Sequence, residues 1–177
     1  MNKSNEVIKV FLANPQNTDQ LWESNAFVEI DWRDYDEDVV KYFNQAIGNM
    51  ISVRMENNKK PYGNDIILIY KDRQLKIPYQ EKMDRDTTIK WVNEIIKDNF
   101  SIRFCALSLG SDTLGFVLLK NEDWGNLETL VGKDKLEHYF SPITLETLMF
   151  DLDFNVVMDY LQIAEINEDI SFDILIS

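Results

Sequence analysis

Cysteine and histidine are almost absent from this chain, which has one of each in 177 residues. The single cysteine, Cys105, cannot form an internal disulfide, so the sequence excludes a disulfide scaffold and a cysteine-rich zinc module. Long apolar runs are also missing, and the longest include IILIY at 66–70 and FVLL at 116–119. These runs are too short for a transmembrane helix or a secretory signal. We therefore expect a soluble, cytoplasmic protein that does not bind membranes.

The scarcity of histidine restricts catalysis by a nucleophile and a base. A Ser-His-Asp or Cys-His site would have to use His138, which lies in KLEHYFSP at 135–142, where a capping or surface role is enough to explain it. Cys105 falls inside an apolar strand pattern, which is typical of a small buried hydrophobe. We therefore expect that the protein is not an enzyme and has no catalytic residues.

Two short segments imitate ligand-binding loops without completing them. SLGSDTLG at 108–115 matches neither the phosphate loop, nor the nucleophile elbow, nor the dinucleotide fingerprint. DLDFN at 151–155 begins like a calcium loop, but Val156 stands where glycine is needed and Gln162 where a bidentate glutamate is needed. The sequence therefore predicts no cofactor and no metal site.

What the chain has in excess is carboxylate, with a net charge of −13. Residues 49–109 carry 8 acids and 11 bases, whereas residues 110–177 carry 14 acids and 3 bases and have no Lys or Arg after Lys135. Such a field repels nucleic acid and anionic membranes and attracts cationic partners. We therefore expect a basic protein partner and no nucleic acid; the alternative is that the acidity serves only solubility.

The hydrophobic periodicity predicts strands in groups with helices between them, which is typical of an α+β fold. We expect one domain over residues 1–177, with one core and a largely antiparallel mixed sheet packed by several helices. Residues 51–79 should form a three-stranded meander, and Asp86 should cap the helix that follows it. The predicted strands cover residues 6–12, 26–32, 51–56, 65–70, 75–79, 100–107, 114–120 and 170–177. The predicted helices cover residues 34–47, 84–99, 121–131, 145–153 and 154–165.

The densest acidic segment is EIDWRDYDED at 29–38. Its last three acids fall in the first turn of the predicted helix, where the helix dipole favours negative charge. Its rings and remaining acids have the composition of a protein interface, although half-buried rings beside solvated acids would look the same. A carboxylate-based hydrolase is a further alternative, but no His, Lys or glycine-rich cradle accompanies these acids. The predicted partner-binding residues are Asp31, Trp32, Asp34, Tyr35, Asp36, Asp151 and Asp153.

The stretch IYKDRQLKIPY, the helix after it, and SIRFCALSLGSDTLGFVLLKNEDWGNLE resemble the small acidic immunity proteins encoded beside bacterial polymorphic or contact-dependent growth inhibition toxins. The resemblance concerns the order of elements between residues 50 and 140. It implies a non-enzymatic inhibitor that binds one toxin domain, in many cases a basic nuclease, and covers its active site or substrate groove. The alternative is an intracellular scaffold or regulatory domain that binds a basic segment of a host protein.

Overall fold

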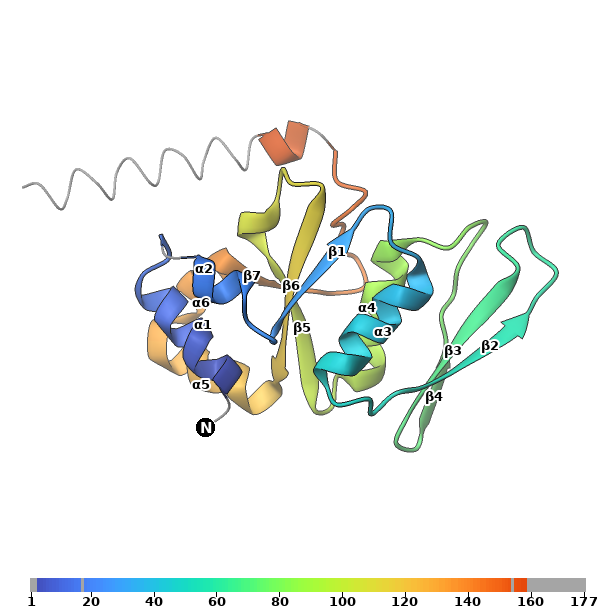
Figure 1. Ribbon diagram of the computed structural model, residues 1–177, viewed down its shortest axis with the longest axis horizontal. Helices are drawn as coiled ribbons and strands as arrows, with labels where there is room; N and C mark the ends of the chain where they lie inside the picture. Colours follow the sequence, from blue (N-terminus) through green and yellow to red (C-terminus); the bar gives the residue numbers. More distant parts are fainter. Residues whose placement is uncertain (1–2, 17, 154, 159–177) are drawn as a thin grey trace, which may run out of the picture.

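Strand β6 (Thr113–Lys120) is the centre of the fold because its residues 114–119 are buried on both faces. It pairs with β1 (Phe27–Asp31) on one side and with β5 (Phe100–Cys105) on the other. The short strand β7 (Phe140–Pro142) pairs with β5, which gives an antiparallel sheet of order β1-β6-β5-β7. The structure, a computed structural model, describes residues 3–16, 18–153 and 155–158 (Figure 1).

Helices cover both faces of this sheet (Figure 1). On one side lie α1 (Lys3–Ala13), α2 (Asp19–Trp22), α5 (Asn121–Val131) and α6 (Lys133–Tyr139), and on the other lie α3 (Asp36–Ala46) and α4 (Arg85–Ile96). Successive residues of a strand point to opposite faces, so Phe116 packs in the cluster with α3 and α4 and Val117 in the cluster with α1 and α5. The expected single core is therefore divided by the sheet into two clusters.

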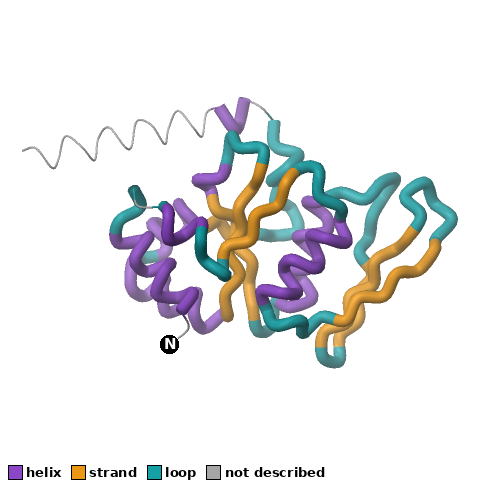
Figure 2. The backbone as a smooth tube through the Cα atoms, in the orientation of Figure 1, coloured by secondary structure: helices purple, strands orange, loops and turns teal. Residues whose placement is uncertain are grey.

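A second antiparallel sheet forms the predicted meander from β2 (Ser52–Asn57), β3 (Asn64–Tyr70) and β4 (Arg73–Lys76). Strand β4 begins two residues before the predicted strand 75–79, and residues 77–79 lie outside it. Ile66 and Leu68 of β3 pack in the same cluster as α3 and α4. Helix α4 contacts both β3 and β5, so α3 and α4 lie between the two sheets, as Figure 2 shows. The α+β prediction is confirmed, with two separate antiparallel sheets in place of one.

Several predicted elements differ from those of the structure. Residues 6–12 are helical, because Ile8, Phe11 and Leu12 form one buried face at helical spacing within α1. Residues 145–153 are turns and irregular backbone, not a helix. The short helical turn η1 (Ala106–Ser108) replaces the end of the predicted 100–107 strand. Of the predicted 154–165 helix, residues 155–158 are helical; its other residues and the predicted 170–177 strand lie outside the described residues.

The helix boundaries follow local chemistry. Gly48, at φ 76°, follows α3 at its predicted end. The cap of α4 is Asp84, whose Oδ1 accepts a hydrogen bond from the Thr87 N–H at 2.7 Å, and not Asp86. Among the residues that the structure describes, we find no helix with the length and apolar character needed to cross a membrane.

Candidate partner-binding surface

The loop between β1 and α3 exposes the two rings chosen from the sequence. Trp32 is 58% exposed and Tyr35 is 75% exposed. The loop is held by its own acids, because Asp34 Oδ2 accepts a hydrogen bond from the Asp31 N–H at 2.8 Å. The Trp32 N–H donates to the Asp112 carbonyl at 3.4 Å and continues the β1–β6 pairing. The alternative that both rings are half-buried is therefore wrong.

Asp31 is ionised and already engaged within the chain. Its carboxylate accepts hydrogen bonds from Arg33 Nε at 2.9 Å and from Arg33 Nη2 at 2.6 Å. These hydrogen bonds, with one from the Arg33 backbone N–H, lower the pKa of Asp31 to about 2. A basic partner would have to compete with Arg33 for this carboxylate.

Asp36 lies in a buried position at the start of α3 and is only 7% exposed. Its carboxylate accepts a hydrogen bond from Thr88 Oγ1, whose oxygen also lies 2.6 Å from the Tyr79 hydroxyl. Burial raises the pKa of Asp36, although the hydrogen bond from Thr88 opposes that shift. This environment leaves little of Asp36 for a partner to touch, so we leave it out of the candidate surface.

The second acidic segment, at Asp151 and Asp153, is exposed and is positioned by a buried acid of α4. The carboxylate of Asp86 accepts backbone N–H bonds from Phe150 at 2.9 Å, from Met149 at 3.0 Å and from Asp151 at 3.4 Å. Three donors from one loop converge on one side chain, which fixes the loop against the N-terminus of α4. Sequence reasoning assigned Asp86 to a cap and missed this role.

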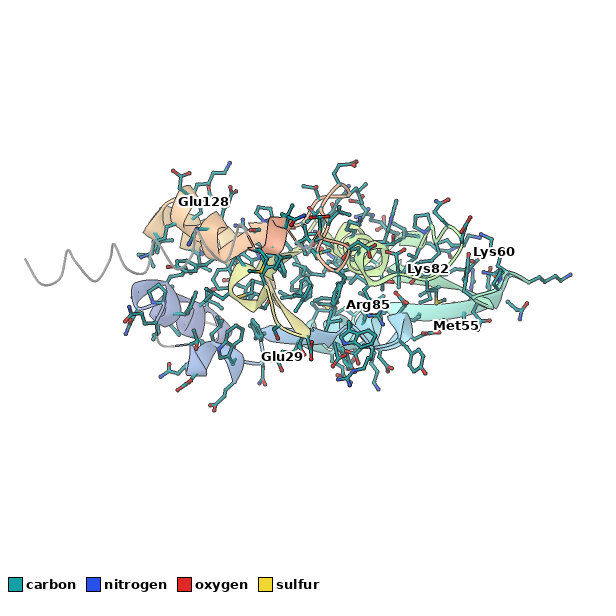
Figure 3. The ribbon with its side chains drawn as sticks, turned by 90° about the horizontal axis from the view of Figure 1, so that it is seen from above. Glu29, Met55, Lys60, Lys82, Arg85 and Glu128 are labelled. Carbon is teal, nitrogen blue, oxygen red and sulfur yellow. The ribbon has the colours of Figure 1, made fainter. Side chains whose placement is uncertain are left out.

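Arg85, the neighbour of Asp86, holds the first acidic segment. Its Nη2 donates to the Asp34 carbonyl at 2.6 Å and its Nε to the Asp31 carbonyl at 3.3 Å. Its guanidinium also lies 6.0 Å from the centre of the Phe150 ring. The first turn of α4 therefore brings residues 31–35 and 149–153 to one region of the surface (Figure 3, where Arg85 is labelled).

An apolar groove of about 460 Å³ lies between these two segments. The β5–β6 connection closes it on a further side, through Leu109 and neighbouring residues, and Asp112 contributes a carboxylate to its wall. We call this feature the apolar groove. Residues that line it include Trp32, Leu109, Leu114, Phe150, Leu152 and Val157.

A second depression, the acidic hollow, lies between β1 and α3 and has a volume of about 650 Å³. The carboxylates of Glu29, Asp31 and Asp34 line it, together with the Tyr42 ring. Asp31 and Trp32 are neighbours in sequence, yet Asp31 lines the hollow and Trp32 lines the groove. The surface therefore offers an apolar groove for an apolar side chain and, beside it, a carboxylate-lined hollow for a basic one.

Other reactive side chains of the described chain lie away from this surface. Cys105 is fully buried between β6 and β7, and burial raises the pKa of its thiol to about 12. His138 lies on α6 with its ring edge-on to Tyr139. No group of three or more His, Cys, Asp or Glu side chains within residues 3–16, 18–153 and 155–158 is arranged to hold a metal ion.

Comparison of the chain with protein-family models, with curated proteins and with solved structures gives no match.

Proposed function

We propose that this protein is a non-enzymatic binding protein that neutralises a basic toxin domain in the cytoplasm, in the manner of an immunity protein. One observation carries the proposal. Two acidic segments far apart in the sequence, residues 31–35 and 151–153, flank the same apolar groove. The order of elements between residues 50 and 140 resembles that of acidic immunity proteins, and this resemblance is the reason for proposing a toxin domain as the partner.

The two parts of the surface have different energetic roles. Trp32 and the apolar groove supply area that loses water on binding, and such buried aromatic anchors dominate the affinity of protein interfaces. Asp112 lines the groove, and the exposed Asp151 and Asp153 lie on either side of its lining residue Leu152. These acids attract a basic domain, which accelerates association more than it adds affinity. A basic active-site cleft would be complementary to both parts.

The test uses the toxin domain encoded by the gene next to that of the protein, with the dissociation constant measured by calorimetry and survival measured in cells that produce the toxin. We expect W32A to weaken binding by about tenfold or more, because exposed aromatic anchors at the centre of an interface have effects of this size. L130A is the matched control, since Leu130 is 62% exposed on α5.

The triple charge reversal D112K/D151K/D153K should slow association and reduce its dependence on salt. A second control, D134K, makes a charge reversal of the same kind at an exposed position of α6. If W32A and the triple variant bound the toxin domain as tightly and as fast as L130A and D134K, the proposed surface would be wrong. Absence of any binding to a neighbouring toxin domain, together with capture of a basic host segment, would favour the scaffold alternative.

A further inference from the structure

The outer edge of β2 has unpaired backbone groups in the part of the chain that the structure describes. β2 pairs only with β3 there, in a register that places Arg54 opposite Ile67 and Met55 opposite Ile66. The Asn58 N–H donates to the Gly63 carbonyl, so the even-numbered residues of β2 direct their N–H and C=O groups toward β3. By the alternation of an antiparallel ladder, Val53, Met55 and Asn57 direct theirs outward.

The side chains of β2 are as accessible as its edge. All six residues of the strand are exposed, including Val53 at 45% and Met55 at 39%. Arg54 and Glu56 lie on the same face and form an ion pair with Nη2 to Oε1 at 3.0 Å. A six-residue strand with no Pro, no Gly and an edge left unpaired by the described residues is a template for pairing with another strand.

We propose that β2 pairs antiparallel with β2 of a second copy of this chain, about a two-fold axis at Met55. Only Val53, Met55 and Asn57 have outward backbone groups that can form hydrogen bonds with the second copy. A two-fold axis at residue 54, 55 or 56 pairs at least two of these three residues with the second copy, so three registers are possible. An axis at Arg54 places two arginines opposite each other, and an axis at Glu56 places two glutamates opposite each other. An axis at Met55 places each Arg54 opposite Glu56 of the second copy.

This register also satisfies the backbone. Met55 of both copies forms a hydrogen-bonded pair on the axis, and Val53 pairs with Asn57 on either side of it. The Arg54 and Glu56 side chains occupy the closer, non-hydrogen-bonded positions, where opposite charges stabilise the pairing and like charges destabilise it. The two meanders then form one continuous antiparallel sheet of six strands.

The net positive charge of the meander repels a second copy less than the net negative charge of the acidic regions would. Residues 52–76 carry 3 acids and 6 bases, although the whole chain has a net charge of −13. Met55 and Lys60 lie together at the end of the molecule formed by the meander (Figure 3). Contact at this end brings the basic regions together and keeps the acidic carboxyl-terminal third out of the interface.

Sedimentation velocity over a range of protein concentrations tests the proposal, with circular dichroism to verify that each variant is folded. The wild-type chain should form a dimer that dissociates on dilution. R54E should place acids opposite acids and E56R bases opposite bases, so each should weaken dimerisation on the order of tenfold. The double variant R54E/E56R restores opposite charges across the axis and should restore the dimer.

M55P removes the outward N–H on the axis without removing a β2–β3 hydrogen bond, and it should also abolish the dimer. K60E is the matched control, since it makes the same charge change as R54E at the exposed turn after β2 and should leave the dimer intact. A wild-type chain that stays monomeric at its highest soluble concentration would overturn the proposal. So would a dimer that R54E and M55P do not weaken, or one that R54E/E56R does not restore.

Discussion

Gly115 and Gly125 are glycines in regular elements with opposite surroundings. A Cβ on Gly115 in β6 would meet the Phe27 ring inside contact distance, with the Cε2 atom at 2.8 Å. The ring would have to shift to admit this Cβ atom, and it would then lose part of its edge-on packing against Trp22, whose ring centre lies 4.6 Å away. A Cβ on Gly125 in α5 would meet no atom within 4 Å.

We therefore predict that G115A and G125A change stability in opposite directions. G115A should lower the free energy of unfolding by about 1–3 kcal/mol, the usual cost of overfilling a packed site. G125A should raise it by about 0.5–1 kcal/mol, because alanine favours a helix interior over glycine. Urea unfolding followed by circular dichroism measures both, and a stabilising G115A would contradict the packing of Phe27 over β6.

The buried carboxyl of Asp36 should make stability depend on pH. Burial raises its pKa in the folded protein, so the folded state binds the proton more tightly than the unfolded state does. The protonated Asp36 carboxyl therefore contributes its full stabilisation below the unfolded pKa of about 3.9. This contribution is lost as pH rises through the higher pKa of the folded state. At neutral pH the Asp36 charge costs stability.

D36N removes this ionisation and keeps an oxygen that can accept the Thr88 hydrogen bond. Relative to the wild-type chain, D36N should gain unfolding free energy as pH rises above the unfolded pKa of about 3.9, because only the wild-type chain then pays for ionising the buried carboxyl. Thermal unfolding at a series of pH values measures the difference. E37Q, which removes an exposed carboxylate from the same helical turn, is the control, and an equal pH trend in both variants would contradict this assignment.

At the scale of elements, the first turn of α4 is the connection between the two acidic segments. Asp86 is 3% exposed and accepts three backbone N–H bonds from residues 149–151. D86A should lower the free energy of unfolding by about 1–3 kcal/mol, because it leaves the Met149 N–H buried without a partner. The amides of residues 149–151 should also exchange with solvent faster.

Hydrogen exchange measured residue by residue tests this prediction. The amides of β6 should keep most of their protection in D86A, since they pair with β1 and β5 and not with residues 149–151. D72A, a change at an exposed acid of the β3–β4 turn, is the control for loss of a carboxylate. Unchanged exchange at residues 149–151 in D86A would show that other contacts hold that loop.

The elements that sequence patterns predicted well are those whose local signals agree. The meander at 51–79 combines an apolar run, a turn and an alternating strand, and α4 has an apolar stripe at helical spacing, although its cap is Asp84 and not the predicted Asp86. The segment 6–12 mixes Val7, Ile8, Val10 and Phe11, a composition that favours a strand as much as a helix. Only packing of Ile8 and Phe11 against the sheet and its helices decides for the helix.

The candidate surface was predictable in part. Trp32 and Tyr35 were selected because rings beside acids are typical of an interface, but the sequence left open whether the rings are exposed or half-buried. Residues 151 and 153 were selected by their charge alone. The groove between the two segments was not predictable, because Arg85 and Asp86 form it through backbone carbonyls and N–H groups. Backbone groups are the same in every residue, so such contacts leave no pattern in the sequence.

At the scale of the molecule, the central sheet lies between two apolar clusters, and β6 contributes side chains to both of them. Phe43 belongs to the cluster with α3 and α4, and Phe11 belongs to the cluster with α1 and α5. Both are fully buried, so F43A and F11A should each lower the free energy of unfolding by about 3–5 kcal/mol. Because Phe116 and Val117 are consecutive in β6 and serve different clusters, we expect one cooperative transition in both variants.

Differential scanning calorimetry of the two variants measures this coupling. A single transition at a lower temperature in F11A and in F43A would support one domain built on both faces of the sheet. An early second transition in F11A alone would instead indicate that α1, α2, α5 and α6 unfold as a separate unit. V10A, at an exposed position of α1, is the control for loss of apolar side-chain atoms from that helix.

The arrangement of Arg85 and Asp86 has a consequence for mapping the binding surface by mutagenesis. These two residues form hydrogen bonds with the backbone of the segments that carry Trp32 and Asp151. Their replacement would therefore displace these binding side chains without removing any of them. An alanine scan would then report large losses of affinity at positions that a partner never contacts. Cross-linking or a structure of a complex would identify fewer residues than the alanine scan. The additional residues from the scan would be those that position the binding loops and do not contact the partner.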